Sequence, residues 1–323
     1  MRRLGILTAA AAFGLAALPA GAETWDMPVA YPATNYHTEN AVAFAEEVAD
    51  QTGGALEIVV HPGGSLFKGD EIKRAVQTGQ VQIGERLISA LANENPLFGV
   101  DALPFLATSF DAARELYEAS RPVLEETLAE QGLKLLYAVP WPPQGLYTKQ
   151  PIEQAADMQG VKFRAYNAAT ARVAELMGAV PTQIEEAELT QAFATGVAES
   201  MISSGATGYD RKLWEHTDYW YDAQAWLPKN MVIVNADAFE SLPEDQQQAL
   251  LDAAATAEER GWAKAQELAD WYKEQLAAQG MQVQPPSDQL KADFEGIGEQ
   301  MTEEWLQSAG EPGKAIVDAY KAM

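Results

Sequence analysis

The sequence lacks cysteine altogether, and its 323 residues include only three histidines, His37, His61 and His216. Without thiols there are no disulfide bonds, no thiolate metal sites, no cysteine nucleophile and no lipid-modified amino-terminal cysteine. The histidines are too dispersed for a sequence-readable metal pattern, and phosphate-loop, G-x-G-x-x-G, G-x-S-x-G and H-E-x-x-H motifs are missing. We therefore expect a protein that is not an enzyme and needs no cofactor.

Positive charge is also scarce, with 22 Lys and Arg against 47 Asp and Glu and a formal net charge of −25. Such an acidic surface repels nucleic acid and anionic membranes, so we expect neither as a partner. An acidic protein that binds an anion needs a local positive site to overcome its own field. Each arginine is therefore informative.

The first 22 residues have the pattern of a secretory signal peptide. Arg2 and Arg3 precede an apolar stretch, Leu4 to Leu18, and the segment ends in A-G-A at residues 20–22. The apolar stretch is shorter than the ~20 residues that a membrane anchor would need. We expect export to the periplasm, cleavage after Ala22 and no stable membrane insertion of the mature chain.

Strand and helix patterns alternate along the chain, which is typical of sheets with parallel strands and helices on their faces. Strands are predicted at 56–60, 81–84, 133–138, 161–164 and 231–234. Helices are predicted after Asp70, which would cap the first of them, at 112–130, in a segment that ends at residue 177, at 185–195 and at 243–278. The last helix carries an apolar stripe of Ala254, Ala257, Gly261, Ala265, Leu268, Tyr272 and Leu276. At ~1.5 Å per residue the length of this helix would exceed ~50 Å, which is enough to span and brace two lobes.

Breaks near residues 140–143 and 219–226 predict two crossings between lobes. We expect lobe I at 23–140 and 223–260, lobe II at 141–222, the bridging helix at 243–279 and C-terminal helices packed on the lobes at 280–323.

Six motifs carry a family resemblance. They read G-V-K-F-R at 160–164, M-G-A-V-P at 177–181, E-L-T-Q-A-F-A-T-G-V at 188–197, H-P-G-G-S-L at 61–66, G-Q-V-Q-I-G at 79–84 and L-P-F-L at 103–106. In their order along the chain they resemble the DctP-type periplasmic solute-binding proteins of tripartite ATP-independent periplasmic (TRAP) transporters. The resemblance implies an α/β, two-lobed, type II-like binding fold, each lobe a mixed or parallel sheet flanked by helices. It also implies a long bridging helix and delivery of the ligand to TRAP permease subunits in the inner membrane.

We expect a receptor for a small organic monocarboxylate, such as an aromatic, hydroxy or keto acid, with a periplasmic sensor feeding a signalling protein as the alternative. Arg164 is the first candidate, because it ends a predicted strand and its guanidinium can hold a carboxylate with two parallel hydrogen bonds. The resemblance gives it that same role. A surface salt bridge is the competing interpretation.

Weaker candidates surround this arginine. Gln144 stands about where some sugar-acid receptors of the family have a second arginine, and Ser203 and Ser204 could donate hydrogen bonds or simply form a turn. Glu186 could pair with a cation or hydroxyl of the ligand, although acidic pairs such as Glu185-Glu186 are usually solvated. Other residues could face the cleft or, for the aromatic ones, pack the hinge: Trp141, Tyr166, Trp226, Tyr36, His37, Arg86 and Ser89. One strong cation among weaker donors favours a monocarboxylate over a dicarboxylate.

Overall fold

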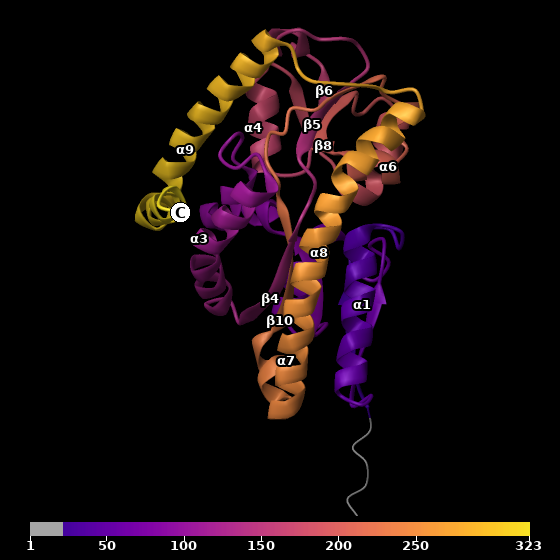
Figure 1. Cartoon of the computed structure of the whole chain (residues 1–323), viewed down its shortest axis with the longest axis vertical. Helices are drawn as coiled ribbons and strands as arrows, with labels where there is room; N and C mark the ends of the chain where they lie inside the picture. The colour runs from indigo at the N-terminus through magenta and orange to yellow at the C-terminus, as the bar shows by residue number, and fades with distance from the viewer. Residues whose placement is uncertain (1–21) are drawn as a thin grey trace, which may run out of the picture.

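The computed structural model describes residues 22–323, so the predicted signal peptide lies outside the described residues except for Ala22. The strands gather in two groups at opposite ends of an elongated molecule (Figure 1). We call the end with β1 to β4 and β10 lobe I, and the end with β5 to β9 and β11 lobe II. None of the helices in the described part combines the length and apolar character that a membrane crossing requires.

Lobe I contains two small sheets. Its strands are β1 (Glu23–Pro28), β2 (Leu56–His61), β3 (Ile83–Leu87), β4 (Leu133–Pro140) and β10 (Lys229–Asn235). β1 and β2 pair in parallel, whereas β10 lies between β3 and β4 and is antiparallel to both. β10 runs against its neighbours because the chain re-enters lobe I through it after building lobe II.

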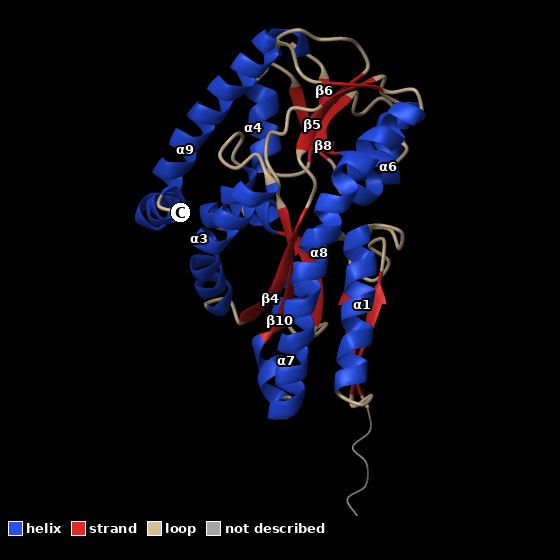
Figure 2. Ribbon diagram, viewed as in Figure 1, coloured by secondary structure: helices blue, strands red, loops and turns tan. Residues whose placement is uncertain are grey.

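Lobe II contains one mixed sheet in the order β11-β9-β5-β8-β6-β7. Its strands are β5 (Gln144–Thr148), β6 (Lys162–Ala165), β7 (Val180–Gln183), β8 (Ser200–Ser204), β9 (Tyr219–Tyr221) and β11 (Gln282–Gln284). β6 is parallel to β7 and β8, while β5 is antiparallel to β8 and β9. In Figure 2 this sheet lies between α4 and α6.

Helices cover both groups of strands. They are α1 (Tyr36–Gln51), α2 (Gly69–Gln77), α3 (Phe110–Ala129), α4 (Ala168–Leu176), α5 (Leu189–Ala194), α6 (Gly205–Asp210), α7 (Ala236–Ser241), α8 (Glu244–Ala278) and α9 (Asp288–Lys321). Short 3-10 helices are η1 (Ile88–Leu91), η2 (Pro96–Ala102), η3 (Ala155–Met158), η4 (Glu186–Glu188) and η5 (Leu213–Glu215). α9 bends sharply at Gly310, whose φ of 62° lies outside the helical region.

The 35-residue α8 runs from lobe I to lobe II, as the sequence predicts (Figure 1). It packs against α1 and β4 of lobe I and against α6 of lobe II. Its predicted stripe faces these partners: every member is buried except Leu268, which is half-buried. The two-lobed α/β fold with a long bridging helix is therefore confirmed, whereas the residue bounds of the lobes stay a prediction.

Gly261 is the point of closest approach between α8 and β4. A β-carbon built there would lie 2.3 Å from Cγ2 of Val139. We therefore expect Gly261→Ala to lower the free energy of unfolding by about 1 to 3 kcal/mol, although alanine is the better helix former.

Gly296 of α9 is the matched control, because a β-carbon there would meet nothing within 4 Å. Gly296→Ala should raise the free energy of unfolding by about 0.5 to 1 kcal/mol. Urea unfolding of both variants tests the packing of α8, and stabilisation by both substitutions would contradict it.

Four local predictions need correction. α2 is capped by Lys68 rather than Asp70, with the Glu71 carboxylate accepting the Lys68 backbone N–H at 2.9 Å. The strand predicted at 81–84 is displaced to β3 and so includes Arg86. The helix predicted at 185–195 begins later, because η4 precedes α5. The stretch with Ser203 and Ser204, for which a turn was one interpretation, belongs to strand β8.

Candidate functional site

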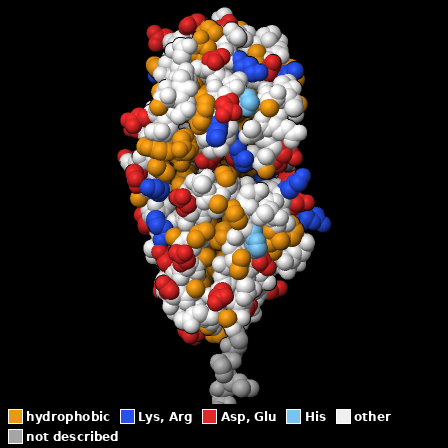
Figure 3. Space-filling view, turned by 90° about the vertical axis from the view of Figure 1, so that its right-hand side faces the viewer, with side chains coloured by type: hydrophobic (Ala, Val, Ile, Leu, Met, Phe, Trp, Pro, Cys, Tyr) orange, Lys and Arg blue, Asp and Glu red, His pale blue; other side chains and the backbone are white. Residues whose placement is uncertain are grey.

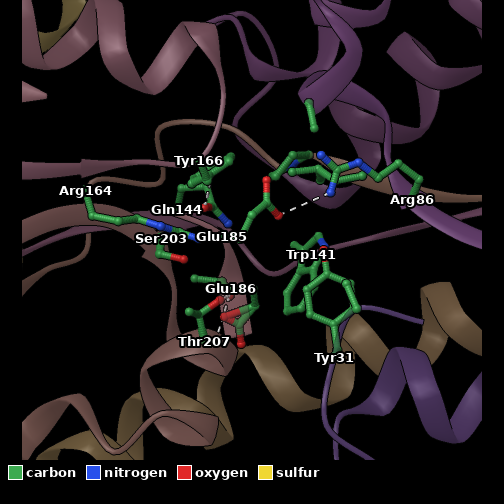
Figure 4. A pocket seen from close by; sticks show the side chains of 15 residues that line it. Tyr31, Arg86, Trp141, Gln144, Arg164, Tyr166, Glu185, Glu186, Ser203 and Thr207 are labelled. Carbon is green, nitrogen blue, oxygen red and sulfur yellow. Dashed lines mark hydrogen bonds and ion pairs between the residues drawn. The ribbon is translucent and has the colours of Figure 1, made fainter. Parts of the chain in front are cut away.

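A cavity with an empty volume of about 500 Å³ lies where the two lobes meet. Lobe I supplies residues after β1, at the end of β3, in η1, after β4 and before β10. Lobe II supplies residues in or next to β5, β6, β8, α6 and the start of η4. The lining residues are Ala30, Tyr31, Arg86, Leu87, Ala90, Trp141, Gln144, Arg164, Tyr166, Glu185, Glu186, Ser203, Ser204, Thr207 and Pro228. We call this cavity the interlobe pocket (Figure 4).

Arg164 extends from β6 into the interlobe pocket between Gln144 and Ser203 (Figure 4). Its Nε donates to the Ile184 carbonyl at 2.9 Å, and its guanidinium lies 5.0 Å from the Tyr166 ring centre. Burial lowers the pKa of Arg164, and the nearby Glu186 carboxylate acts in the opposite direction. Within residues 22–323, its two terminal nitrogens make no hydrogen bond or ion pair with the protein. This geometry leaves a fixed cationic fork facing the cavity.

The other charged side chains of the lining are paired. Arg86 lies 3.4 Å from Glu185 across the pocket, and Glu186 accepts a hydrogen bond from Nε of Arg211 at 2.7 Å. These pairs leave Arg164 as the one lining cation without an acidic partner among the described residues. The pocket thus offers a single unmatched positive charge within an acidic protein, whose visible Asp and Glu spread over both lobes in Figure 3.

Neutral polar groups form a chain along one side of the pocket. Trp226 donates to the Tyr166 hydroxyl at 3.1 Å, and that hydroxyl donates to Oε1 of Gln144 at 3.2 Å. The Gln144 amide donates in turn to the Pro142 carbonyl at 3.0 Å. The Ser203 hydroxyl also lines the pocket and has no hydrogen-bond partner among the described residues, so it is available to a ligand.

Tyr31 and Trp141 form an aromatic wall, with ring centres 4.8 Å apart. Both donate to Oδ1 of Asn230, at 3.4 and 2.9 Å, and the Asn230 amide donates to Oε1 of Glu85 at 3.0 Å. Glu85 is 2% exposed, and the described residues give it no cationic partner. Burial raises the pKa of Glu85 to about 8. The wall therefore rests on a carboxyl group that is protonated at neutral pH.

Replacing Glu85 with glutamine tests this protonation through stability. Because the folded-state pKa is raised, the folded protein keeps a proton that the unfolded chain loses, and wild-type stability falls as pH rises from about 4.5 to about 8. Glu85→Gln removes that dependence. As pH rises through this window, the free energy of unfolding of Glu85→Gln minus that of the wild type should increase by on the order of 1 kcal/mol per pH unit. Urea unfolding at several pH values measures it, and a constant difference would contradict an ionisable, proton-bearing Glu85.

Eight of the predicted site residues line the interlobe pocket: Trp141, Gln144, Arg164, Tyr166, Glu186, Arg86, Ser203 and Ser204. The other four lie behind the lining. Trp226 donates to Tyr166, Tyr36 donates to the Pro140 carbonyl, and Ser89 accepts from Asn167. His37 is buried against Trp141, with ring centres 4.3 Å apart. None of these four side chains lines the interlobe pocket, so a direct part in ligand binding stays a prediction for them.

Seven lining residues had not been singled out for the site: Ala30, Tyr31, Leu87, Ala90, Glu185, Thr207 and Pro228. Of these, Glu185 had been assigned to a solvated acidic pair. The structure corrects that interpretation, because Glu185 faces Arg86 and its neighbour Glu186 is 8% exposed.

Polar contacts join the lobes beside the pocket. The Asn35 amide donates to Asp210 at 2.7 Å, and the Asn167 amide donates to Ser89 at 2.9 Å. Together with Arg86 and Glu185, these contacts hold lobe I against lobe II. The described conformation is therefore closed around the pocket.

A larger open groove lies elsewhere, between residues 104–108, residues 222–224 and α9, with an empty volume of about 1950 Å³. Its charged lining consists of five carboxylates and Lys291. No group of three His, Asp or Glu side chains in the described part of the chain could hold a metal ion. The interlobe pocket is thus the site whose charges suit a small anion.

The family described as bacterial extracellular solute-binding protein, family 7, matches residues 29–308. Among solved structures, a marine metagenome TRAP solute-binding protein specific for pyroglutamate, from an unidentified microbe, is 53% identical with a TM-score of 0.93. The match covers 94% of this chain and 99% of that one. The Bordetella pertussis receptor DctP6, which binds pyroglutamic acid, is 51% identical with a TM-score of 0.92. That match covers 93% of this chain and 100% of DctP6.

A characterised relative is more distant. The ectoine/5-hydroxyectoine-binding periplasmic protein UehA of Ruegeria pomeroyi is 26% identical over 322 residues, which span 97% of this chain and 94% of UehA. The similarity therefore extends over nearly the full length of both proteins, including both lobes and the pocket between them.

Proposed function

The chain belongs to bacterial extracellular solute-binding protein family 7, and from this premise we propose that it is a periplasmic receptor for pyroglutamate. It would bind this acid between its lobes, leave it chemically unchanged and pass it to the membrane subunits of a TRAP permease. The signal peptide would direct the chain across the inner membrane and be removed after Ala22.

The ligand assignment rests mainly on Arg164, the lining cation that has no acidic partner among the described residues. Pyroglutamate has one carboxylate, and Arg164 offers one guanidinium fork with two free terminal nitrogens. A dicarboxylate would place its second negative group beside Glu185 or Glu186, where it would be repelled. Two receptors about half identical to this chain bind pyroglutamate, which supports the same choice here.

The remaining surface of the pocket suits a small ring. Tyr31, Trp141 and Tyr166 present aromatic faces, and the cavity is small enough for them to enclose a five-membered lactam. Aromatic walls with a few polar groups are typical of pockets that bind small cyclic ligands. The ring carbonyl could accept a hydrogen bond from Ser203, whose hydroxyl has no partner among the described residues.

A thermal-shift experiment tests the proposal. The protein is freed of carried-over ligand by unfolding and refolding, then heated with L-pyroglutamate, succinate, glucuronate or ectoine. Pyroglutamate at 100 times its dissociation constant should add about 2.7 kcal/mol of stability, while the other acids should shift the melting temperature less. A shift with another acid and none with pyroglutamate would overturn the assignment.

A further inference from the structure

Glu186 has an unsatisfied carboxylate oxygen inside the interlobe pocket. The residue is 8% exposed, and one oxygen, Oε1, accepts from Arg211 at 2.7 Å. The other oxygen, Oε2, is buried without a hydrogen-bond partner among the described residues. A buried polar atom without a partner costs about 1 to 3 kcal/mol, and more when it is charged. Because Glu186 lines the interlobe pocket, a ligand bound there can supply the group that satisfies this oxygen.

The kind of group that Oε2 needs follows from its charge. Burial raises the pKa of Glu186, but the adjacent Arg211 and Arg164 act in the opposite direction. A carboxylate that accepts a charge-assisted hydrogen bond from Arg211 is held in the ionised form. An ionised carboxylate can only accept hydrogen bonds. Oε2 therefore requires an N–H or O–H donor.

The placement of that donor follows from Arg164. Both residues line the pocket, each carries a charge that acts on the pKa of the other, and no ion pair joins them. Figure 4 shows Glu186 on the same side of the pocket as Ser203 and Thr207. A ligand held by its carboxylate at Arg164 can turn the atom next to that carboxylate toward Glu186. In pyroglutamate that neighbour is the ring N–H, bonded to the carbon that bears the carboxylate.

We propose that Glu186 determines specificity by accepting, through Oε2, an N–H that the ligand carries next to its carboxylate. This inference rests on the proposed function and narrows it to acids that carry a hydrogen-bond donor next to the carboxylate, of which the lactam is one. A keto acid or a lactone acid offers a lone pair at that position and is repelled by the carboxylate.

The test compares two ligands that differ at one ring atom. L-Pyroglutamate is titrated calorimetrically against its lactone counterpart, in which an oxygen replaces the N–H. We expect wild-type protein to prefer the lactam by about 100-fold, because a site built around a ligand N–H rejects the analogue that lacks it. Equal affinities would overturn the inference and leave the proposed function intact. Absence of pyroglutamate binding would overturn both.

Two variants test whether Glu186 causes the preference for the lactam over the lactone. In Glu186→Gln the side chain can still accept from Arg211 while its amide faces the ligand, so the lactam preference should fall to about tenfold or less. Glu188→Gln makes the same change two residues later, at an exposed side chain that lies near Lys68 outside the interlobe pocket, and should keep the wild-type ratio. A Glu186→Gln protein that retains the full preference would overturn the assignment, as would a Glu188→Gln protein that loses it. The wild-type comparison decides the point even if a variant fails to fold.

Discussion

Replacing Arg164 with alanine should weaken pyroglutamate binding by at least about 30-fold. The substitution leaves the ligand carboxylate in a closed pocket without its cation, and such losses cost about 2 to 5 kcal/mol. Arg164→Lys should also bind poorly, because a single ammonium group cannot reproduce two parallel hydrogen bonds while the guanidinium is held by Ile184 and Tyr166. Isothermal titration of each variant gives the dissociation constant.

Arg172→Ala is the matched control for this experiment. Arg172 lies on α4, eight positions after Arg164, but it pairs with Glu304 and Glu175 near the surface. Its loss should leave pyroglutamate affinity within about twofold of wild type, since exposed ion pairs contribute about 0 to 1 kcal/mol. Normal binding by Arg164→Ala would make Arg164 a structural residue. Circular dichroism should show both variants folded, because Arg164 makes only one hydrogen bond to the rest of the described chain, residues 22–323.

Replacing Asp101 with alanine should lower the free energy of unfolding by about 3 to 5 kcal/mol, because it leaves Lys229 charged and unpaired in the core. Lys229 is 1% exposed, its Nζ lies 3.8 Å from Oδ2 of Asp101, and its backbone N–H donates to that oxygen at 2.8 Å. Burial raises the pKa of Asp101 and lowers the pKa of Lys229, while their mutual attraction opposes both shifts. Urea unfolding measures the loss.

A double variant separates pairing from packing. Asp101→Leu combined with Lys229→Met removes both charges and should recover most of the stability that Asp101→Ala loses. Lys264→Ala, which breaks a partly exposed pair with Glu267, should cost no more than about 1 kcal/mol. If the single and double variants lose the same free energy of unfolding, the contribution of Asp101 to stability does not come from its pairing with Lys229.

Local patterns predicted the bridging helix and the strand that carries Arg164. Both depend on short-range periodicity: residues 161–164 read as a strand, and the stripe on α8 repeats every three or four residues. The same signals failed at β5, which follows two prolines and is buried at every position. Hydrophobic alternation is lost in such a strand, so nothing local marks it.

Much of the pocket could not be predicted from local sequence. Glu185 and Glu186 look like a solvated acidic pair, and their cationic partners Arg86 and Arg211 stand 99 and 25 residues away in the chain. Tyr31, Thr207 and Pro228 reach the pocket from segments without any binding pattern. Only the folded arrangement shows that Arg164 is left without an acidic partner among the described residues, which supports the monocarboxylate that the sequence already favoured.

The most direct test of the account is a calorimetric titration of ligand-free wild-type protein with L-pyroglutamate. We predict saturable binding at one site per chain, with a dissociation constant that rises when Arg164 is replaced and does not change when Arg172 is replaced. No saturable heat with pyroglutamate, together with tight binding of a dicarboxylate, would contradict the assignment of the interlobe pocket to a single carboxylate held by Arg164.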